Sequence, residues 1–141
     1  MKVVIDANII FAMLISGKNI YIEILEGIEA YSPDFILKEI EKYENFIIRK
    51  THVKNNFNHI IHNFFKKITI IPKIAISKNS FQVAYKLCKE IDEKDTPYVA
   101  LSLELDAYLW SNDKKLKNEL NKKNFGKVLT TDDMILLLRG K

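Results

Sequence analysis

Three aspartates stand where an apolar segment ends or a helix begins. Asp6 ends the apolar run of "VVID", Asp113 follows the apolar stretch "AYLW" after two polar residues, and Asp95 precedes a helix start at Thr96. In parallel α/β sheets, functional side chains collect beyond the carboxyl ends of the strands. Each aspartate could instead cap the helix that follows it, and Thr96 could cap in place of Asp95. For each aspartate taken alone, a functional role and a capping role are both open.

A fourth acid, Glu39, lies within the apolar face of a predicted helix. At about 100° per residue it falls between Phe35 and Tyr43, on the stripe that also carries Ile36 and Ile40. A carboxylate among packed apolar side chains is costly unless a partner satisfies it. The alternative is that Glu39 lies at the edge of the stripe and reaches water.

Together, the four acids indicate a site for a divalent cation. Four carboxylates around one site would repel one another without such an ion. Mg²⁺ and Mn²⁺ prefer oxygen ligands and keep several waters, so a few carboxylates suffice. The chemistry that this ion supports is phosphodiester hydrolysis by an activated water. No comparable zinc site is predicted, because His59 and His62 read as surface residues and Cys88 as an inert packing residue.

The composition is that of a soluble globular protein. The chain has 141 residues, 48% of them hydrophobic and 28% charged, so we expect residues 1–141 to form a single domain. We predict a cytoplasmic protein with no membrane contact, because no apolar run approaches a bilayer span and no signal peptide is evident. A single cysteine agrees with a reducing compartment. The net charge of +4 agrees with an anionic partner such as nucleic acid.

Strand patterns alternate with helical patterns along the chain. Strands are predicted at 2–6, 68–72, 107–111 and 127–130, and helices near 8–15, 19–28, 33–49, 55–67, 79–91, 95–106, 113–121 and 131–139. The helix at 33–49 is predicted from Ser32 as its cap and Pro33 as its first residue. Alternating strands and helices predict an α/β fold with a parallel sheet covered on both faces.

These motifs resemble those of the PIN-domain nucleases, whose best-known members are the VapC-type toxins of toxin–antitoxin pairs. The resemblance runs from "VVIDANII" to "VLTTDDMILLL" and is most specific in "IDEKDTPYVALSLELDAYLWSNDKKL". The stretch "YSPDFILKEIEKY" is similar to the family segment that carries its helical acid. The resemblance implies a three-layer α/β/α sandwich, and it places the family's acidic quartet at Asp6, Glu39, Asp95 and Asp113.

The same resemblance implies an activity, cofactors and partners. It implies Mg²⁺- or Mn²⁺-dependent cleavage of RNA by a water nucleophile, usually in a homodimer, with an antitoxin as protein partner in the toxin members. Asn8 and Ser111 are similar to supporting polar residues beside the site. We expect Asp132 and Asp133 to cap the last helix, and Asp92 to be the solvated end of the preceding helix rather than an additional site acid.

Two other functions compete with this interpretation. A PIN-like RNA-binding or scaffold module would share the fold without catalysis, but such a module has no need to keep Glu39 on an apolar face. A phosphatase or phospho-acceptor domain would use Asp6 as its nucleophile. Phosphatases of that kind usually carry a second aspartate where this chain has Asn8. Phospho-acceptor domains usually carry a lysine where this chain has Thr130 and Thr131.

Overall fold

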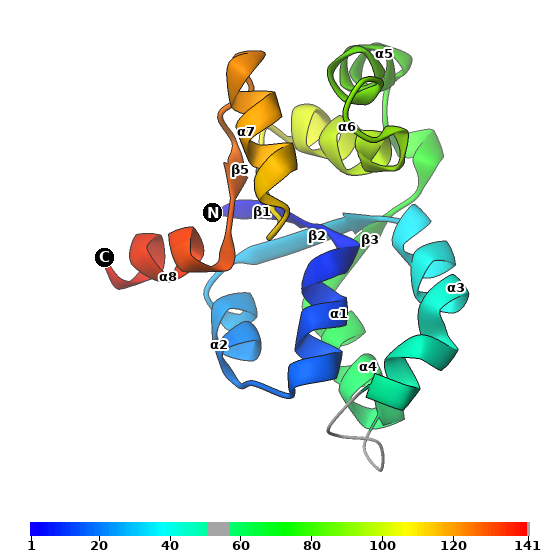
Figure 1. Ribbon diagram of the computed structural model, residues 1–141, viewed down its shortest axis with the longest axis vertical. Helices are drawn as coiled ribbons and strands as arrows, with labels where there is room; N and C mark the ends of the chain where they lie inside the picture. Colours follow the sequence, from blue (N-terminus) through cyan, green and yellow to red (C-terminus); the bar gives the residue numbers. More distant parts are fainter. Residues whose placement is uncertain (51–56, 141) are drawn as a thin grey trace.

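A parallel five-stranded sheet lies at the centre of the computed structural model, which describes residues 1–50 and 57–140 (Figure 1). Its strand order is β3-β2-β1-β4-β5, and all four pairings are parallel. The strands are β1 (Lys2–Ile5), β2 (Glu29–Pro33), β3 (Ile68–Ile71), β4 (Tyr108–Trp110) and β5 (Val128–Leu129). The predicted α/β class is therefore confirmed.

Helices cover both faces of the sheet and make the three layers of an α/β/α sandwich. The α-helices are α1 (Ala7–Ser16), α2 (Ile20–Glu26), α3 (Phe35–Lys50), α4 (Phe57–Lys67), α5 (Lys78–Cys88), α6 (Thr96–Leu105), α7 (Lys114–Lys122) and α8 (Thr131–Arg139), with short 3-10 helices η2 (Lys73–Ala75) and η3 (Glu93–Asp95). Helices α1, α2 and α4 lie on one side of the sheet, and α5, α6 and α7 lie on the other (Figure 1). Within the described ranges, none of the helices has the length and apolar character needed to cross a membrane.

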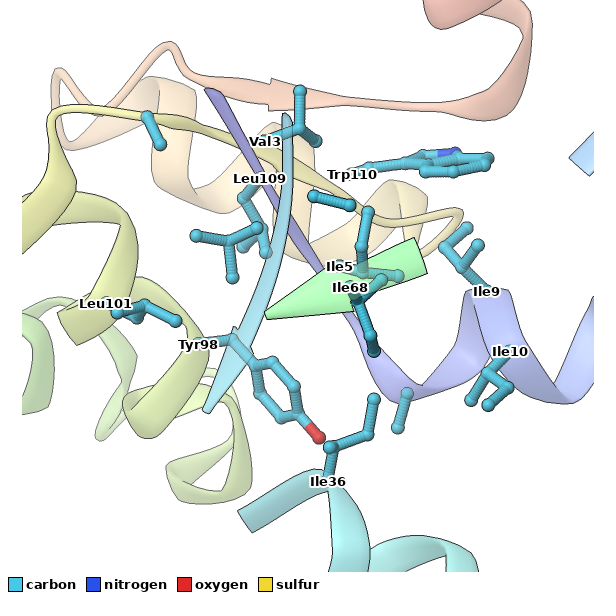
Figure 2. Packing of buried hydrophobic residues seen from close by; sticks show 14 of the residues in the cluster. Val3, Ile5, Ile9, Ile10, Ile36, Ile68, Tyr98, Leu101, Leu109 and Trp110 are labelled. Atoms are coloured by element: carbon cyan, nitrogen blue, oxygen red, sulfur yellow. The ribbon is translucent and has the colours of Figure 1, made fainter. Parts of the chain in front are cut away.

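The central strand β1 is buried on both faces, as this layering requires. Val3, Val4 and Ile5 are fully buried. Figure 2 shows Leu109 and Trp110 of β4 and Leu101 of α6 packed in the same core. The apolar runs before Asp6 and Asp113 therefore anchor these two acids to the buried centre of the sheet.

One strand, β2, is absent from the sequence prediction. The prediction that Ser32 caps a helix begun by Pro33 is wrong, because both residues belong to β2 and α3 begins at Phe35. The predicted helix at 19–28 likewise ends earlier, at Glu26. Ser32 is buried and donates its hydroxyl proton to the carbonyl oxygen of Ile5 over 3.0 Å. Backbone pairing of β2 with strands on both sides outweighs the local Ser-Pro signal.

The other element boundaries differ only at their ends. The predicted helix at 79–91 ends earlier, at Cys88, where a turn begins that leads to η3. The predicted helix at 55–67 is α4, which begins at Phe57 among the described residues; positions 55 and 56 lie outside them.

The Ser32 hydroxyl should stabilise the junction of β1 and β2. We expect Ser32→Ala to lower the free energy of unfolding by about 1 kcal/mol, because it removes one buried hydrogen bond to the Ile5 carbonyl. Chemical denaturation measures this change. Ser16→Ala, which removes an exposed hydrogen bond to Lys18, is the control and should change stability by less than about 0.5 kcal/mol. Equal midpoints for the two variants would contradict the role given to Ser32.

Candidate active site

Asp6 and Ser111 lie side by side because β1 and β4 are neighbouring parallel strands. Ile5 pairs with Trp110, and the backbone N–H of Asp6 donates to the Trp110 carbonyl over 3.1 Å. The Ser111 hydroxyl then donates to Oδ2 of Asp6 over 2.7 Å, and both side chains are buried. Asp6 occupies the residue before α1, but its side chain makes no capping hydrogen bond. The capping alternative is therefore wrong for Asp6.

Ser111 is the centre of a small polar network. Its Oγ accepts hydrogen bonds from Asn8 Nδ2 at 3.1 Å and from the backbone N–H of Asp113 at 3.2 Å. Oδ1 of Asn8 in turn accepts from the backbone N–H of Asn112 at 3.4 Å. Asn8 and Ser111 thus lie beside Asp6, and they tie the loop after β4 to the first turn of α1.

Asp113 does cap α7. Its Oδ1 accepts a hydrogen bond from the backbone N–H of Leu116 at 3.0 Å. The side chain is otherwise exposed, and it lies at the rim of the pocket described below. A structural role for one of its oxygens is compatible with a role for the carboxylate in the pocket.

Asp95 has a buried carboxylate oxygen without a partner. The residue precedes α6 but makes no capping hydrogen bond, so the capping alternative is wrong for it. Among the described residues, only Oδ2 of Asp95 and Oγ1 of Thr96 are buried side-chain oxygens or nitrogens that lack a hydrogen-bond partner. A native protein rarely leaves such an atom unsatisfied, and a bound ion is one of the recognised explanations.

Burial and neighbouring negative charges raise the pKa of Asp95 to about 8. Loss of hydration is the largest cause, followed by repulsion from Asp6, Asp92, Asp113 and Glu39. Burial also raises the pKa of Asp6 to about 6, although the hydrogen bond from Ser111 opposes the shift. Both groups would ionise more readily beside a cation.

Glu39 is half-buried on α3 and is held by a buried tyrosine. Ile36 and Ile40 of the same helix are packed in the core, as the apolar stripe predicts. The Tyr98 hydroxyl donates to Oε1 of Glu39 over 2.5 Å. Burial raises the pKa of Glu39, and this hydrogen bond works against the shift. The pKa of Tyr98 is raised by burial and by Glu39, so its hydroxyl stays a donor.

Tyr98, which contacts Glu39, and Lys94, which lines the pocket described below, are residues that the sequence prediction missed. Tyr98 lies three residues after Asp95, which immediately precedes α6, so the two residues lie about one helical turn apart. This spacing was the local signal that could have singled out Tyr98.

The four acids line one pocket of about 370 Å³, together with Asp92 and Lys94. Asp92 is exposed and its side chain caps η3 through the backbone N–H of Lys94, so it has a structural role as well as a place at the rim. Apolar side chains also line this pocket: Phe11, Ile15, Tyr43, Phe46 and Ile47.

The donor set fits a hydrated Mg²⁺ or Mn²⁺ ion. No three described His, Cys, Asp or Glu side chains approach closely enough to hold an ion by themselves. Mg²⁺, however, dehydrates reluctantly and usually binds through one or two carboxylates with several waters. The partnerless oxygen of Asp95 and the raised pKa values of Asp6 and Asp95 are what such an ion would relieve.

The remaining candidate residues lie outside the pocket, in a helix cap, on the surface or in the core. Asp133 belongs to the capping box of α8, as predicted, but its partner there is Thr130. The prediction that Asp132 also caps this helix is wrong, since its side chain is exposed and outside the capping box. His59 and His62 are exposed on α4. Cys88 is fully buried, and burial raises the pKa of its thiol to about 12, in agreement with an inert packing residue.

Sequence comparison identifies the family. Residues 4–130 match the model of the PIN domain. The chain belongs to the PIN domain family. PIN domains are generally nucleases. A comparison with curated proteins gives no significant match to this PIN domain.

A solved structure has the same fold. This PIN domain is similar to a chain in the crystal structure of VapBC2 from Rickettsia felis bound to a DNA fragment from their promoter. The two chains are 16% identical and superpose with a TM-score of 0.63, over 92% of this chain and 98% of the other. At this identity the similarity establishes a shared fold.

The pKa of Asp95 predicts a pH-dependent stability. Because the folded-state pKa is about 8 and the ordinary value is 3.8, the metal-free folded state binds more protons than the unfolded state between these values. The stability that this extra proton binding contributes is fully present below pH 3.8 and is lost as the pH rises towards 8. We expect Asp95→Asn to raise the free energy of unfolding at pH 8 in EDTA by about 0.5–2 kcal/mol, since solvent screens part of the effect.

Thermal unfolding in EDTA at pH 5 and pH 8 measures this difference. The gain in the free energy of unfolding should be smaller at pH 5, because the Asp95 carboxyl of the folded parent protein is already neutral at that pH. Glu44→Gln, at an exposed position inside α3, is the control and should change stability by less than about 0.5 kcal/mol at either pH. A variant less stable than the parent at pH 8 would contradict the electrostatic role of Asp95.

Proposed function

We propose that residues 1–141 act as one PIN domain with Mg²⁺- or Mn²⁺-dependent endoribonuclease activity. The observation that carries this proposal is the buried, partnerless Oδ2 of Asp95 in a pocket lined by three further carboxylates. Membership of a family whose members are generally nucleases supports the reaction class. The reaction is hydrolysis of an RNA phosphodiester bond by water.

In this proposal Asp6, Glu39, Asp95 and Asp113 hold the ion, directly or through water. When bound, the ion supplies an activated water and stabilises the leaving oxygen. Ser111 fixes one oxygen of Asp6, and Asn8 holds Ser111 in place.

Lys94 supplies a positive charge at the rim of the same pocket, where a substrate phosphate would enter. The positive net charge of the chain also supports RNA as the substrate class.

We further propose that this protein is the toxin of a toxin–antitoxin pair in the cytoplasm and that it works as a homodimer. Similarity in fold to VapBC2 supports an antitoxin as the protein partner. The homodimer rests on the family resemblance. Growth arrest on expression of the parent chain, absent with Asp6→Asn, would support the toxin role.

The proposed reaction is tested with purified protein and a mixed panel of single-stranded and structured RNAs. Cleavage should require Mn²⁺ or Mg²⁺ and stop in EDTA. Asp6→Asn prepared in parallel controls for a contaminating nuclease. Absence of both cleavage and metal binding would favour the non-catalytic RNA-binding or scaffold module instead.

Each of the four acids should be needed for cleavage but not for folding. We expect Asp6→Asn, Glu39→Gln, Asp95→Asn and Asp113→Asn each to lower metal-dependent cleavage about 100-fold or more, because each removes a charge that holds the ion. Initial rates of RNA cleavage measure the loss, and circular dichroism checks the fold.

The substitution at Asp113 separates two roles of one residue. Asparagine caps a helix about as well as aspartate, so Asp113→Asn should keep α7 intact while removing the charge. Glu44→Gln on the exposed side of α3 and Asp132→Asn on α8 are matched controls with normal expected rates. Normal turnover in any of the four variants would remove that residue from the site.

A further inference from the structure

Glu39 depends on α6 for its place in the pocket. Glutamate is a long, flexible side chain, and this one lies half-buried in the pocket that Asp6, Asp95 and Asp113 also line. Its charge is attracted by Lys94 and Lys42 and repelled by Asp92. Without a hydrogen-bond donor, a half-buried carboxylate favours positions closer to solvent. The Tyr98 hydroxyl donates a hydrogen bond to Oε1 of this carboxylate and not to Oε2.

Tyr98 is rigid enough to hold that carboxylate. Its side chain is only 1% exposed, and its ring packs edge-on against Phe35 with the ring centroids 6.2 Å apart. Figure 2 shows the ring of Tyr98 projecting from α6, with its hydroxyl oxygen directed towards the start of α3 near Ile36. Because the ring is fixed by packing, the position of the hydroxyl is set by the core and not by the solvent.

The same helix turn carries a second acid of the pocket. Asp95 immediately precedes α6, and Tyr98 follows it by one turn. The start of α6 therefore presents one carboxylate directly and holds another, from α3, by a hydrogen bond.

We propose that Tyr98 is a positioning residue that holds the Glu39 carboxylate in the pocket through its hydroxyl. The role rests on the proposed metal-dependent function, since it acts through Glu39 on the ion. Groups that orient metal ligands typically contribute tenfold to hundredfold to metal affinity.

The test is Mn²⁺ binding measured by titration calorimetry on the full chain. Tyr98→Phe keeps the ring and its contact with Phe35 and removes only the hydroxyl. We expect its Mn²⁺ dissociation constant to rise about tenfold. Tyr85→Phe, which removes a hydroxyl from a 47%-exposed side chain on α5, is the matched control and should bind as the parent does.

A double-mutant cycle separates positioning from a general structural effect. Once Glu39→Gln has weakened binding, adding Tyr98→Phe should cause little further loss, whereas a structural defect would add its full effect. In RNA cleavage, Tyr98→Phe should lower kcat and leave KM within about twofold, because Tyr98 is buried away from the substrate.

The outcomes distinguish this inference from the function on which it rests. Parent-like Mn²⁺ affinity in Tyr98→Phe, with weakened affinity in Glu39→Gln, would overturn the role of Tyr98 and leave the metal site standing. Additive losses in the cycle would also overturn it. A parent protein that binds no Mn²⁺ would overturn both.

Discussion

The parallel pairing of β1 with β4 brings Asp6 beside Ser111 from positions 105 residues apart in the chain. Both strands end at the same edge of the sheet, so the residue after each strand emerges at the same place. The Ser111 hydroxyl, held by Asn8 and by the backbone of Asp113, joins the two ends. A slip of one residue in this register would turn Asp6 to the other face of the sheet and break its hydrogen bond with Ser111.

The four carboxylates around the pocket differ in how they are held. Asp6 is fixed by Ser111, Glu39 by Tyr98 and Asp113 by the backbone at the start of α7. Asp95 alone keeps a buried oxygen without a donor, and its pKa is raised to about 8. The fold therefore anchors three acids with hydrogen bonds and leaves the fourth under electrostatic strain, which is the usual signature of a site built for function at some cost in stability.

Packing links this strain to the core. Tyr98 belongs to the buried cluster and donates a hydrogen bond to Glu39 of the pocket, and its neighbour on α3, Phe35, lies one turn before Glu39. Ile5 and Trp110 play the corresponding part on the sheet, because each is fully buried and directly precedes a polar residue of the site. Each site residue is thus one or a few positions away from a side chain that cannot move without opening the core.

Much of this arrangement follows from local patterns in the sequence. The apolar runs before Asp6 and Asp113 predicted the strands β1 and β4, alternation of strands and helices predicted the parallel sheet, and helical spacing placed Glu39 on a packed face. These signals are readable because they depend on residues close together in the chain. Capping, also a local interaction, was an open alternative for Asp6, Asp95 and Asp113 and was expected of Asp132 and Asp133. It is realised at Asp113 and Asp133.

Tertiary structure decided the features that depend on distant partners. Strand β2 exists because strands on both sides supply its hydrogen bonds, and these override the Ser-Pro signal for a helix. Asp6 prefers Ser111 to its own helix because the sheet places that hydroxyl 2.7 Å away. The sequence determined by itself which acids were candidates and which segments carry them. Only the folded chain determined the partners of those acids, because hydrogen bonding and charge repulsion act through space and not along the sequence.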